Sequence, residues 1–302
     1  MNTTQPIAIP DSRTLNKGYA IAVTGVVLWS TTAIFISYLL TRYTLAPLTL
    51  AFWRDLFTTS ALALGLLATR RDLLRIERRH RLFLVGYGLS LTLMNTLWTF
   101  SVALNGAAVA TVLVYSSPAF TAVAARWLFG ERLTLGRIAA IAASLIGCAL
   151  VSGAYAPQAW SVNPWGIVVG IGAGLGFTLY SLTGKFSARR GINSWTATLS
   201  AFAIATCALL LTQNGATLFT LGRAVDGWAI LFVLAVLPTL GGFGLYTASL
   251  SYLPAGTANL IATLEPALTA LLAFLLLGES LNAAQWIGSA LILGGVVSLR
   301  GN

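Results

Sequence analysis

Long apolar runs separated by short polar loops dominate the chain. Their hydrophobic positions are continuous, with none of the alternation that marks the strands of a membrane barrel. A bilayer is crossed by about 20 residues of helix, and helices satisfy their own backbone hydrogen bonds in lipid. We therefore predict an all-α membrane protein with ten transmembrane helices. The predicted spans are 18–40, 47–69, 82–104, 106–129, 135–153, 163–186, 193–213, 227–250, 255–277 and 283–299.

The composition agrees with this pattern and excludes several classes of protein. Of the 302 residues, 57% are hydrophobic and 9% are charged, whereas soluble domains carry about 25% charged residues. The two cysteines, Cys148 and Cys207, lie inside apolar runs, and His80 is the single histidine. The sequence has no motif for a zinc enzyme, a serine hydrolase or a nucleotide-binding loop. We expect no enzyme activity, no catalytic residues, no cofactor and no metal.

The net charge of +10 is explained by topology rather than by nucleic-acid binding. If the N-terminus is placed on one side of the membrane and ten crossings are followed, that side contains fifteen of the eighteen basic residues. The other side contains Arg42, Arg54 and Arg223. Basic residues are retained in the cytoplasm. The sequence therefore predicts an inner (plasma) membrane protein with both termini in the cytoplasm and a polar, disordered tail over 1–17.

The two halves of the chain resemble each other at an offset of 148 residues. Without a gap, Pro118 aligns with Pro266 and the Gly130-Glu131 pair aligns with 278–279. We divide the chain into a first repeat (18–153), a linker (154–162) and a second repeat (163–302). Because each repeat holds five spans, an odd number, the second must enter the membrane in the opposite orientation.

Inverted repeats of this kind are typical of secondary transporters, with the substrate site near the bilayer midplane. We expect a small-molecule substrate and alternating access to a central cavity, with the lipid bilayer as the surroundings and no nucleic-acid partner. An uptake carrier or passive facilitator for organic solutes or cations is one alternative, and a membrane scaffold without transport is another. The sequence leaves the oligomeric state and the direction of transport open.

Glu265 is the strongest candidate for a binding residue, because it lies within an apolar span and is followed by Pro266. A charged side chain at the middle of a membrane helix costs about 2.5–3.5 kcal/mol on insertion scales. Such a residue is expected to face a cavity or a partner. Glu265 would contact a substrate amine or carry a coupling proton, and the alternative is a neutral acid that serves packing.

Aromatic and small polar residues at similar depths predict a cavity lined by the first, third, fourth, sixth, eighth and ninth spans. Aromatic faces with a few polar groups suit a small amphipathic or cationic solute. The remaining cavity candidates are Trp29, Asn95, Trp98, Thr99, Tyr115, Ser117, Tyr180, Ser181 and Tyr246. The candidates for kinks or gates are Pro118, Pro238, Gly241, Gly242 and Pro266.

The other acids and the membrane arginine have structural interpretations. Glu131 and Glu279 follow glycines in short turns, so we expect each to cap the helix that comes next. Arg54 and Asp55 are adjacent in a span, and neighbouring residues do not face each other on a helix. We therefore expect Arg54 to reach the interface, to pair with another span or to serve packing.

These residues also carry a resemblance to a known family. The stretch from Leu264 to Gly294 (LEPALTALLAFLLLGESLNAAQWIGSALILG), its first-half copy around Pro118, and Phe52–Asp55 (FWRD) resemble EamA domains of the drug/metabolite transporter superfamily. The resemblance covers nearly the whole chain. It implies a ten-helix inverted-repeat carrier, and many members of the family export amino acids or related metabolites.

Overall fold

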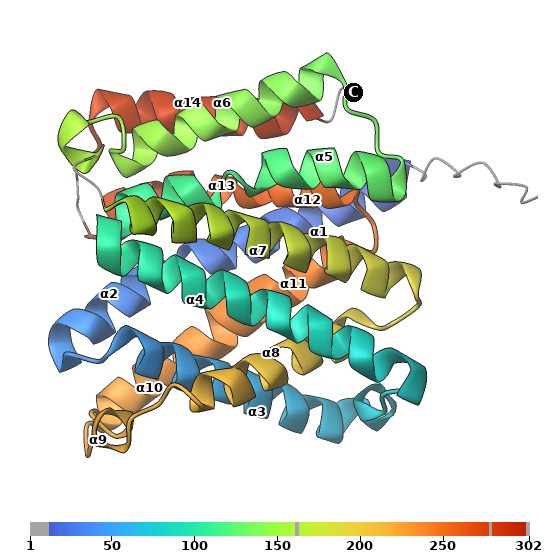
Figure 1. Ribbon diagram of the computed structural model, residues 1–302, viewed down its shortest axis with the longest axis vertical. Coiled ribbons are helices and arrows are strands. Elements are labelled where there is room, and N and C mark those ends of the chain that lie inside the picture. The colour runs from blue at the N-terminus through green and yellow to red at the C-terminus, as the bar shows by residue number, and fades with distance from the viewer. Residues whose placement is uncertain (1–11, 161–162, 278–279, 300–302) are drawn as a thin grey trace, which may run out of the picture.

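The computed structural model describes residues 12–160, 163–277 and 280–299, and within these ranges the chain forms helices and no strands (Figure 1). The α-helices are α1 (Ser12–Ser30), α2 (Thr32–Tyr43), α3 (Pro47–Thr69), α4 (Arg78–Val114), α5 (Ser117–Phe129), α6 (Leu135–Ser152), α7 (Pro164–Arg189), α8 (Ser194–Leu210), α9 (Gly215–Leu218), α10 (Val225–Leu234), α11 (Gly242–Ser249), α12 (Ala255–Ala262), α13 (Leu264–Leu277) and α14 (Ala283–Ser298). Two 3-10 turns, η1 (Arg71–Leu74) and η2 (Pro157–Trp160), and a π-helix, η3 (Ala235–Gly241), complete these elements.

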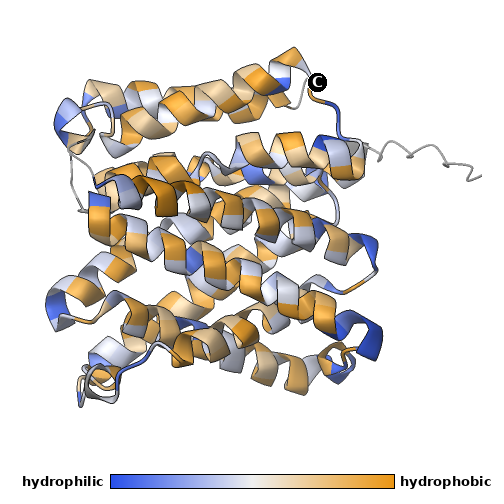
Figure 2. Ribbon diagram, in the orientation of Figure 1, coloured by the Kyte–Doolittle hydropathy of each residue, from blue (hydrophilic) through white to orange (hydrophobic). Residues whose placement is uncertain are grey.

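The helices lie roughly along one direction, so the loops gather at two ends of the bundle. We call one the basic end; it holds the loops at 70–78, 130–134, 190–193 and 250–254. The opposite end holds 44–46, the turn at Gly106, 153–160 and 211–224. Apolar residues run along the helices between the two ends, while hydrophilic residues concentrate at the ends (Figure 2). This distribution is that of a protein embedded in a bilayer.

Seven helical stretches are long and apolar enough to cross a membrane, and two shorter apolar helices accompany them, Ser194–Leu210 and Ala283–Ser298. The described chain is therefore an all-helical protein with several membrane spans. The expected tail overlaps α1, which begins at Ser12, so regular structure starts earlier than predicted; residues 1–11 lie outside the described residues.

One of the seven stretches, Arg78–Phe129, doubles back on itself. Its Gly106 has φ 78° and ψ 163°, a conformation that side-chain-bearing residues rarely adopt. A Cβ on Gly170 of α7 would lie 2.6 Å from the Ser101 hydroxyl and 2.5 Å from the Leu113 side chain. In a continuous helix, twelve residues would separate those two positions by about 18 Å. The chain therefore reverses at Gly106, and α7 packs against both arms.

Contacts between α6 and α14 exchange partners at the 148-residue offset. A Cβ on Gly147 would lie 2.6 Å from the Gly288 carbonyl oxygen, and a Cβ on Gly295 would lie 2.9 Å from that of Ala140. Position 147 corresponds to 295, and 140 corresponds to 288. An exchange of partners at a constant offset is the pattern that a twofold relationship between the two helices would produce. Because position 140 faces 295 while position 147 faces 288, the two helices run antiparallel.

A second contact pair obeys the same exchange. Gly18 of α1 packs on Leu253, and Gly166 of α7 packs on Asn105, with a Cβ at 2.8 Å and 2.3 Å from its neighbour, respectively. At the offset of 148, position 18 corresponds to 166 and position 105 corresponds to 253, so the two contacts are equivalent. The relationship therefore extends beyond α6 and α14 into the helices that surround the candidate site.

Candidate functional site

Glu265 lies where two interrupted helices meet. The helix before it is broken at Thr263, and the corresponding break in the first half lies at Tyr115 and Ser116. The Tyr115 hydroxyl donates a hydrogen bond to the Glu265 Oε2 atom. The structure thus brings together two predicted site residues from opposite halves.

One oxygen of the Glu265 carboxylate has no hydrogen-bond partner among the described residues. The Glu265 side chain is only half-buried, although it lies in the first turn of α13, deep in a candidate span. Within the described residues, hydrogen bonding engages Oε2 alone. The Oε1 atom can therefore accept a hydrogen bond from a solute.

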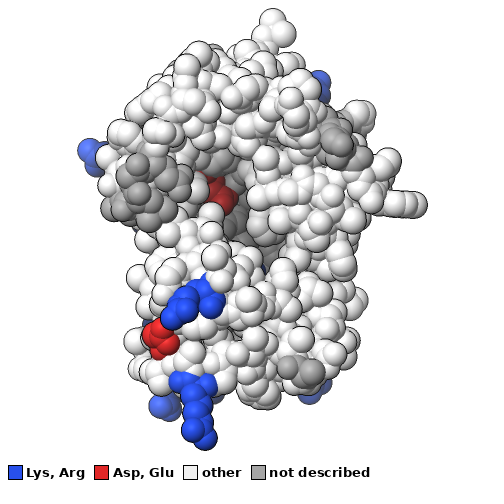
Figure 3. Space-filling model, turned by 90° about the vertical axis from the view of Figure 1, so that its left-hand side faces the viewer, with Lys and Arg blue, Asp and Glu red and all other residues white. Residues whose placement is uncertain are grey.

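A hollow opens on the opposite end of the bundle, and an acidic side chain is visible inside it (Figure 3). Three of the described acids lie in candidate spans: Asp55 is completely buried, Asp226 is exposed at the start of α10, and Glu265 retains exposed surface deep in its span. A half-buried carboxylate at this depth avoids the desolvation cost of full burial because water can reach it. The hollow provides an aqueous approach from one side of the bundle.

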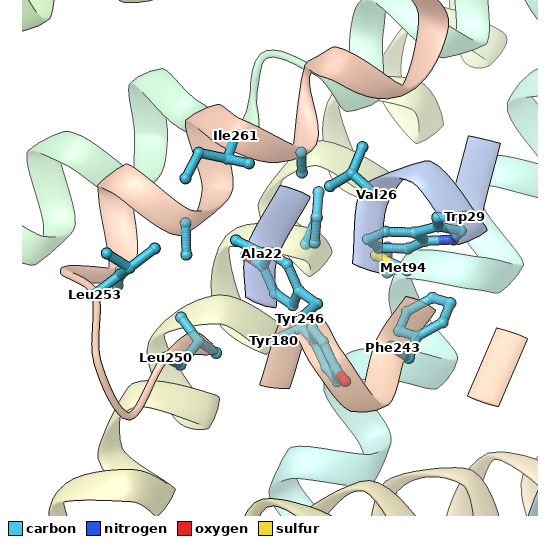
Figure 4. Packing of buried hydrophobic residues seen from close by; sticks show 14 of the residues in the cluster. Ala22, Val26, Trp29, Met94, Tyr180, Phe243, Tyr246, Leu250, Leu253 and Ile261 are labelled. Carbon is cyan, nitrogen blue, oxygen red and sulfur yellow. The ribbon is translucent and has the colours of Figure 1, made fainter. Parts of the chain in front are cut away.

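Aromatic rings pack beneath this region from three helices. Trp29 lies 4.2 Å from Phe243 and 5.8 Å from Tyr246, between ring centroids, and makes an edge contact with Phe177 at 5.9 Å. Figure 4 shows Trp29, Phe243 and Tyr246 facing one another in the core. Trp29 and Phe177 are equivalent positions of the two halves, so the halves meet at this contact.

A buried hydrogen-bond network continues from the aromatic cluster. The Ser117 hydroxyl donates to Asn259 Oδ1 at 2.9 Å, and Asn259 Nδ2 donates to the Ser181 hydroxyl at 2.7 Å. Ser181 in turn shares a 2.6 Å hydrogen bond with the Tyr246 hydroxyl. All four side chains are completely buried. They link α5, α12, α7 and α11 as packed protein in this conformation.

A second set of hydroxyls lies beside the first. Thr247 bonds the Tyr180 hydroxyl at 2.9 Å and the Tyr87 hydroxyl at 3.1 Å, and the two tyrosine rings stack at 4.8 Å. Tyr180 is therefore also sealed by protein groups. Outside α4, the cavity candidates fall into two groups, one near the open hollow and one in the closed part of the bundle.

The three candidates on α4 are half-buried but are not part of either network. Asn95 has a buried Nδ2 atom without a partner among the described residues. The Thr99 hydroxyl donates to the Asn95 backbone carbonyl, which is an ordinary bond within the helix. Trp98 makes no ring contact or hydrogen bond within the same ranges. Asn95 is the member of this group with unused donor capacity.

The predicted kink residues occupy helix interruptions. Pro118 lies in the first turn of α5, and Pro266 lies in the first turn of α13. Proline is tolerated there because the first-turn amides lack partners within the helix. Each break therefore precedes its proline, at equivalent positions of the two halves.

Pro238 lies inside the π-helix between α10 and α11. Backbone hydrogen bonds of a π-helix join residues five apart, so the Leu234 carbonyl faces the Thr239 amide rather than Pro238, which has no amide to donate. The Thr239 hydroxyl donates a further hydrogen bond to the same carbonyl at 2.8 Å. Gly241 and Gly242 follow, and a Cβ on Gly242 would lie 3.2 Å from the Trp29 side chain. The glycines permit close packing of this irregular segment on α1.

The basic end is closed by two charged side chains that hold the 250–256 segment. The Lys185 ammonium donates to the Leu250 and Leu253 carbonyls at 2.8 and 2.7 Å. Glu131 accepts from the Ala255 amide at 2.7 Å, where α12 begins. We call Lys185 and Glu131 the latch.

The expectation that Glu131 caps the helix that follows it was therefore wrong. Instead of the following helix α6, which is capped by the Thr134 side chain, Glu131 caps the distant helix α12. Arg137 fixes the carboxylate in place at 2.8 Å. The chain reversal around Gly130 turns Glu131 toward the second half of the protein. Glu279 lies outside the described residues.

The expectation that Arg54 and Asp55 would not face each other was also wrong. The guanidinium bends back and bonds the carboxylate of its neighbour Asp55, with Nε and Nη2 both 3.0 Å from Oδ1. Both residues are buried. The arginine side chain is long enough to reach an adjacent carboxylate, although the Cβ atoms diverge.

The sequence interpretation missed Asn259, Thr247, Tyr87 and Lys185. Asn259 is an amide inside an apolar span, and this unusual placement could have identified it. Lys185 was counted as a loop charge, since it lies near the end of its span. Among the described residues, no group of three or more His, Cys, Asp or Glu side chains could hold a metal ion.

Together, the apolar bundle, the hollow and the carboxylate between two broken helices are typical of a membrane transport protein. The chain belongs to the EamA-like transporter family, whose model matches residues 16–153 and again 164–300. Proteins of this family are transporters, so the chain is a transporter and not an enzyme, and the scaffold alternative is set aside.

Similar proteins are also named as transporters or exporters. The chain is 30% identical over 223 residues to the threonine/homoserine exporter RhtA of Salmonella typhimurium, covering 73% of the chain and 71% of the relative. It is 30% identical over 190 residues to an uncharacterized transporter of Archaeoglobus fulgidus, covering 63% of the chain and 66% of the relative. A solved protein structure with 20% identity superimposes with a TM-score of 0.76, covering 93% of this chain and 96% of that one, and shows the same fold.

Proposed function

We propose that this protein is an inner-membrane secondary transporter that moves amino acids or similar small amphipathic metabolites, in the direction of export, by alternating access. The observation that carries the proposal is the half-buried Glu265 at the junction of two broken helices, hydrogen-bonded to Tyr115. A carboxylate with a free oxygen above an aromatic cluster suits a solute that carries both an amine and an apolar part.

The proposal includes ten membrane crossings. The reversal at Gly106 divides the Arg78–Phe129 stretch into two arms, and α8 and α14 are apolar although short. Counting the two arms and the two short helices gives ten segments. A helix of 16 or 17 residues is at the lower limit of a span.

The proposal also includes two inverted halves, 18–153 and 163–302. It is supported by the exchange of contacts between α6 and α14 and between the pairs Gly18–Leu253 and Gly166–Asn105. A twofold axis between antiparallel equivalent helices inverts one half relative to the other. The same axis allows the halves to exchange conformations, so that the open end and the closed end can change places.

The basic end is assigned to the cytoplasm, with both termini on that side, because fifteen of the eighteen Lys and Arg residues of the sequence fall there. The described conformation is then open toward the outside, through the hollow at the opposite end, and closed toward the cytoplasm by the latch. An exporter in this state has released its substrate or exchanges it with the external medium.

An amino acid is the substrate class that the site favours. The relative RhtA is named as an exporter of threonine and homoserine, which are small amino acids with a hydroxyl group. In this chain, Glu265 would bind the substrate amine, and the donor of Asn95 would bind a carboxylate or hydroxyl oxygen. Glu265 would alternatively carry a coupling proton, in which case transport responds to a pH gradient.

Counterflow in proteoliposomes tests this function. Vesicles are loaded with unlabelled solute, and the transient accumulation of labelled threonine, homoserine, aromatic amino acids or organic cations is measured with and without a pH gradient. A carrier produces a transient overshoot, whereas a passive channel does not. We expect an amino acid to give the overshoot, Glu265→Gln to abolish it and Glu77→Gln, at an exposed loop position, to preserve it.

An uptake carrier remains the second candidate, because the twofold relationship makes the scaffold nearly symmetric. Net flux is then set by the gradients of solute and coupling ion. Measurement of efflux and uptake in cells, with the gene deleted and restored, separates the two directions. An absence of any counterflow would contradict both.

A further inference from the structure

A pocket of about 190 Å³ lies at the basic end, between the loop before α4 and the connection from α7 to α8. Its charged lining consists of three arginines and one glutamate. The lining comprises Arg75, Ile76, Glu77, Arg79, His80, Leu84, Arg190, Gly191, Ile192, Asn193 and Thr196. The pocket therefore carries a net positive charge at an end of the bundle.

Two of these arginines are available to a ligand. Glu77 pairs with Arg79 at 2.6 Å, which leaves Arg75 and Arg190 without an acidic partner in the described ranges. The nearby Asp72 is engaged by Arg70 at 3.1 Å, and this hydrogen bond lowers the pKa of Asp72. The local carboxylates thus do not neutralise the pocket.

An apolar groove of about 350 Å³ runs along α4 and α7 next to the pocket. On α4 its residues follow the helical spacing 82, 86, 89 and 93, so they form one stripe about 16 Å long. Its two hydroxyls, of Ser90 and Thr183, donate to carbonyls of their own helices. The groove is lined by Leu82, Phe83, Gly86, Leu89, Ser90, Leu93, Leu179 and Thr183.

The groove and the pocket are continuous at Phe83. Phe83 lines the groove, and the guanidinium of Arg190, which lines the pocket, lies 4.1 Å from the centroid of its ring. Gly86 faces the open space of the groove, because a Cβ at this position would have no atom within 4 Å. An amphipathic ligand would thus place an anionic group and an apolar chain on one continuous surface.

We propose that this surface binds one anionic phospholipid, with its phosphate between Arg75 and Arg190 and an acyl chain over Gly86. Basic pockets at the cytoplasmic side of membrane helices attract anionic headgroups, and each basic residue contributes a separate attraction. The groove favours a lipid over a soluble anion, since a soluble anion would leave it empty. The bound lipid would bridge the start of α4 and the end of α7, the helix that carries Lys185.

The experiment compares delipidated protein in detergent, by native mass spectrometry, with phosphatidylglycerol, with phosphatidylethanolamine of the same acyl chains, and with inorganic phosphate. The wild type should retain phosphatidylglycerol preferentially. Arg190→Gln should weaken this retention by about fivefold, the equivalent of about 1 kcal/mol for each basic residue near the headgroup. Gly86→Leu should weaken both lipids, because its side chain fills the groove.

Two variants serve as controls. Gly65→Leu is the match for Gly86→Leu, since Gly65 is also exposed on a helix with no atom within 4 Å of a Cβ. Arg81→Gln removes an exposed charge that does not line the pocket. Neither should change lipid retention by as much as twofold, and thermal melting should show that all four variants are folded.

Four outcomes would overturn the proposal. Equal retention in wild type and Gly86→Leu would exclude the groove, and an unchanged preference for phosphatidylglycerol in Arg190→Gln would exclude the pocket. Competition by inorganic phosphate as strong as that by lipid would identify a soluble-anion site. A change of oligomeric state in Gly86→Leu without loss of lipid would assign the groove to a second copy of the chain.

Discussion

The hydroxyl of Tyr115 donates a hydrogen bond to the carboxylate of Glu265, although 150 positions separate the two residues. Each lies at the break of a helix, at nearly equivalent places in the two halves of the chain. The bond thus joins the halves at the point where a solute entering the hollow would arrive. This position gives one carboxylate both a structural partner and an unoccupied oxygen.

Replacement of Glu265 should impair transport more than folding. We expect Glu265→Gln to remove solute-dependent counterflow, and Tyr115→Phe to reduce it by about 10- to 100-fold, because a hydrogen bond to a charged group contributes about 1.5–3 kcal/mol. Counterflow rates and melting temperatures are measured on the same preparations. Counterflow at the wild-type rate in Glu265→Gln would exclude the amine role, and an unchanged response of transport to a pH gradient would exclude the proton role.

Loosening the latch should open the basic end. In a background without native cysteines, Ser187→Cys is a reporter, since Ser187 is buried near this end of α7. Glu131→Gln removes the charge that caps α12, and a cost of about 1.5–3 kcal/mol should raise thiol labelling by about tenfold or more. Glu77→Gln, an exposed acid at the same end, is the control. Equal labelling in both variants would argue against a latch.

The close contact of α6 and α14 should tolerate no side chain. Gly147→Leu and Gly288→Leu should lower the free energy of unfolding by about 1–3 kcal/mol or more, because the added carbons would overlap the facing backbone. Gly294→Leu, on α14 but with no atom within 4 Å of a Cβ, should leave stability nearly unchanged. Unfolding in detergent measures all three, and similar stability of the 147 and 294 variants would contradict the packing.

The π-helix should depend on the hydroxyl of Thr239. Thr239→Val removes the side-chain hydrogen bond to the Leu234 carbonyl, and we expect a loss of about 0.5–1.5 kcal/mol. Pro238→Ala supplies an amide four residues after Leu234, so this carbonyl can take an α-helical partner and the double variant should recover much of the loss. A double-mutant cycle of unfolding free energies measures the coupling, and strictly additive effects would show that the two residues do not act on the same carbonyl.

Much of the fold followed from the sequence, because bilayer spans require continuous apolar helices and the 148-residue offset repeats proline and glycine positions. The membrane location of Glu265 was predictable for the same reason, since a charge in an apolar run is conspicuous. Its partner Tyr115 was a separate candidate, and their contact was not predictable. Contacts between residues so far apart depend on how the broken helices cross.

Other parts of the site depend on tertiary structure alone. Tyr180, Ser181 and Tyr246 are completely buried because their hydroxyls bond side chains of other helices, and the local sequence does not specify these contacts. The latch was missed because Lys185 and Glu131 have ordinary local environments, and their partners lie in another part of the chain. The bend of Arg54 toward Asp55 is a choice of side-chain rotamer.

Distance measurements at both ends of the same molecule test the central claim of alternating access most directly. One spin-label pair is placed on Arg189 and Ser251 at the basic end, and a second pair on Arg42 and Ala107 at the opposite end, in protein without native cysteines. Lys185→Met releases the 250–256 segment while keeping the apolar stem of the side chain. The account predicts that this substitution lengthens the first distance and shortens the second. A longer distance at the basic end with an unchanged or longer distance at the opposite end would contradict it.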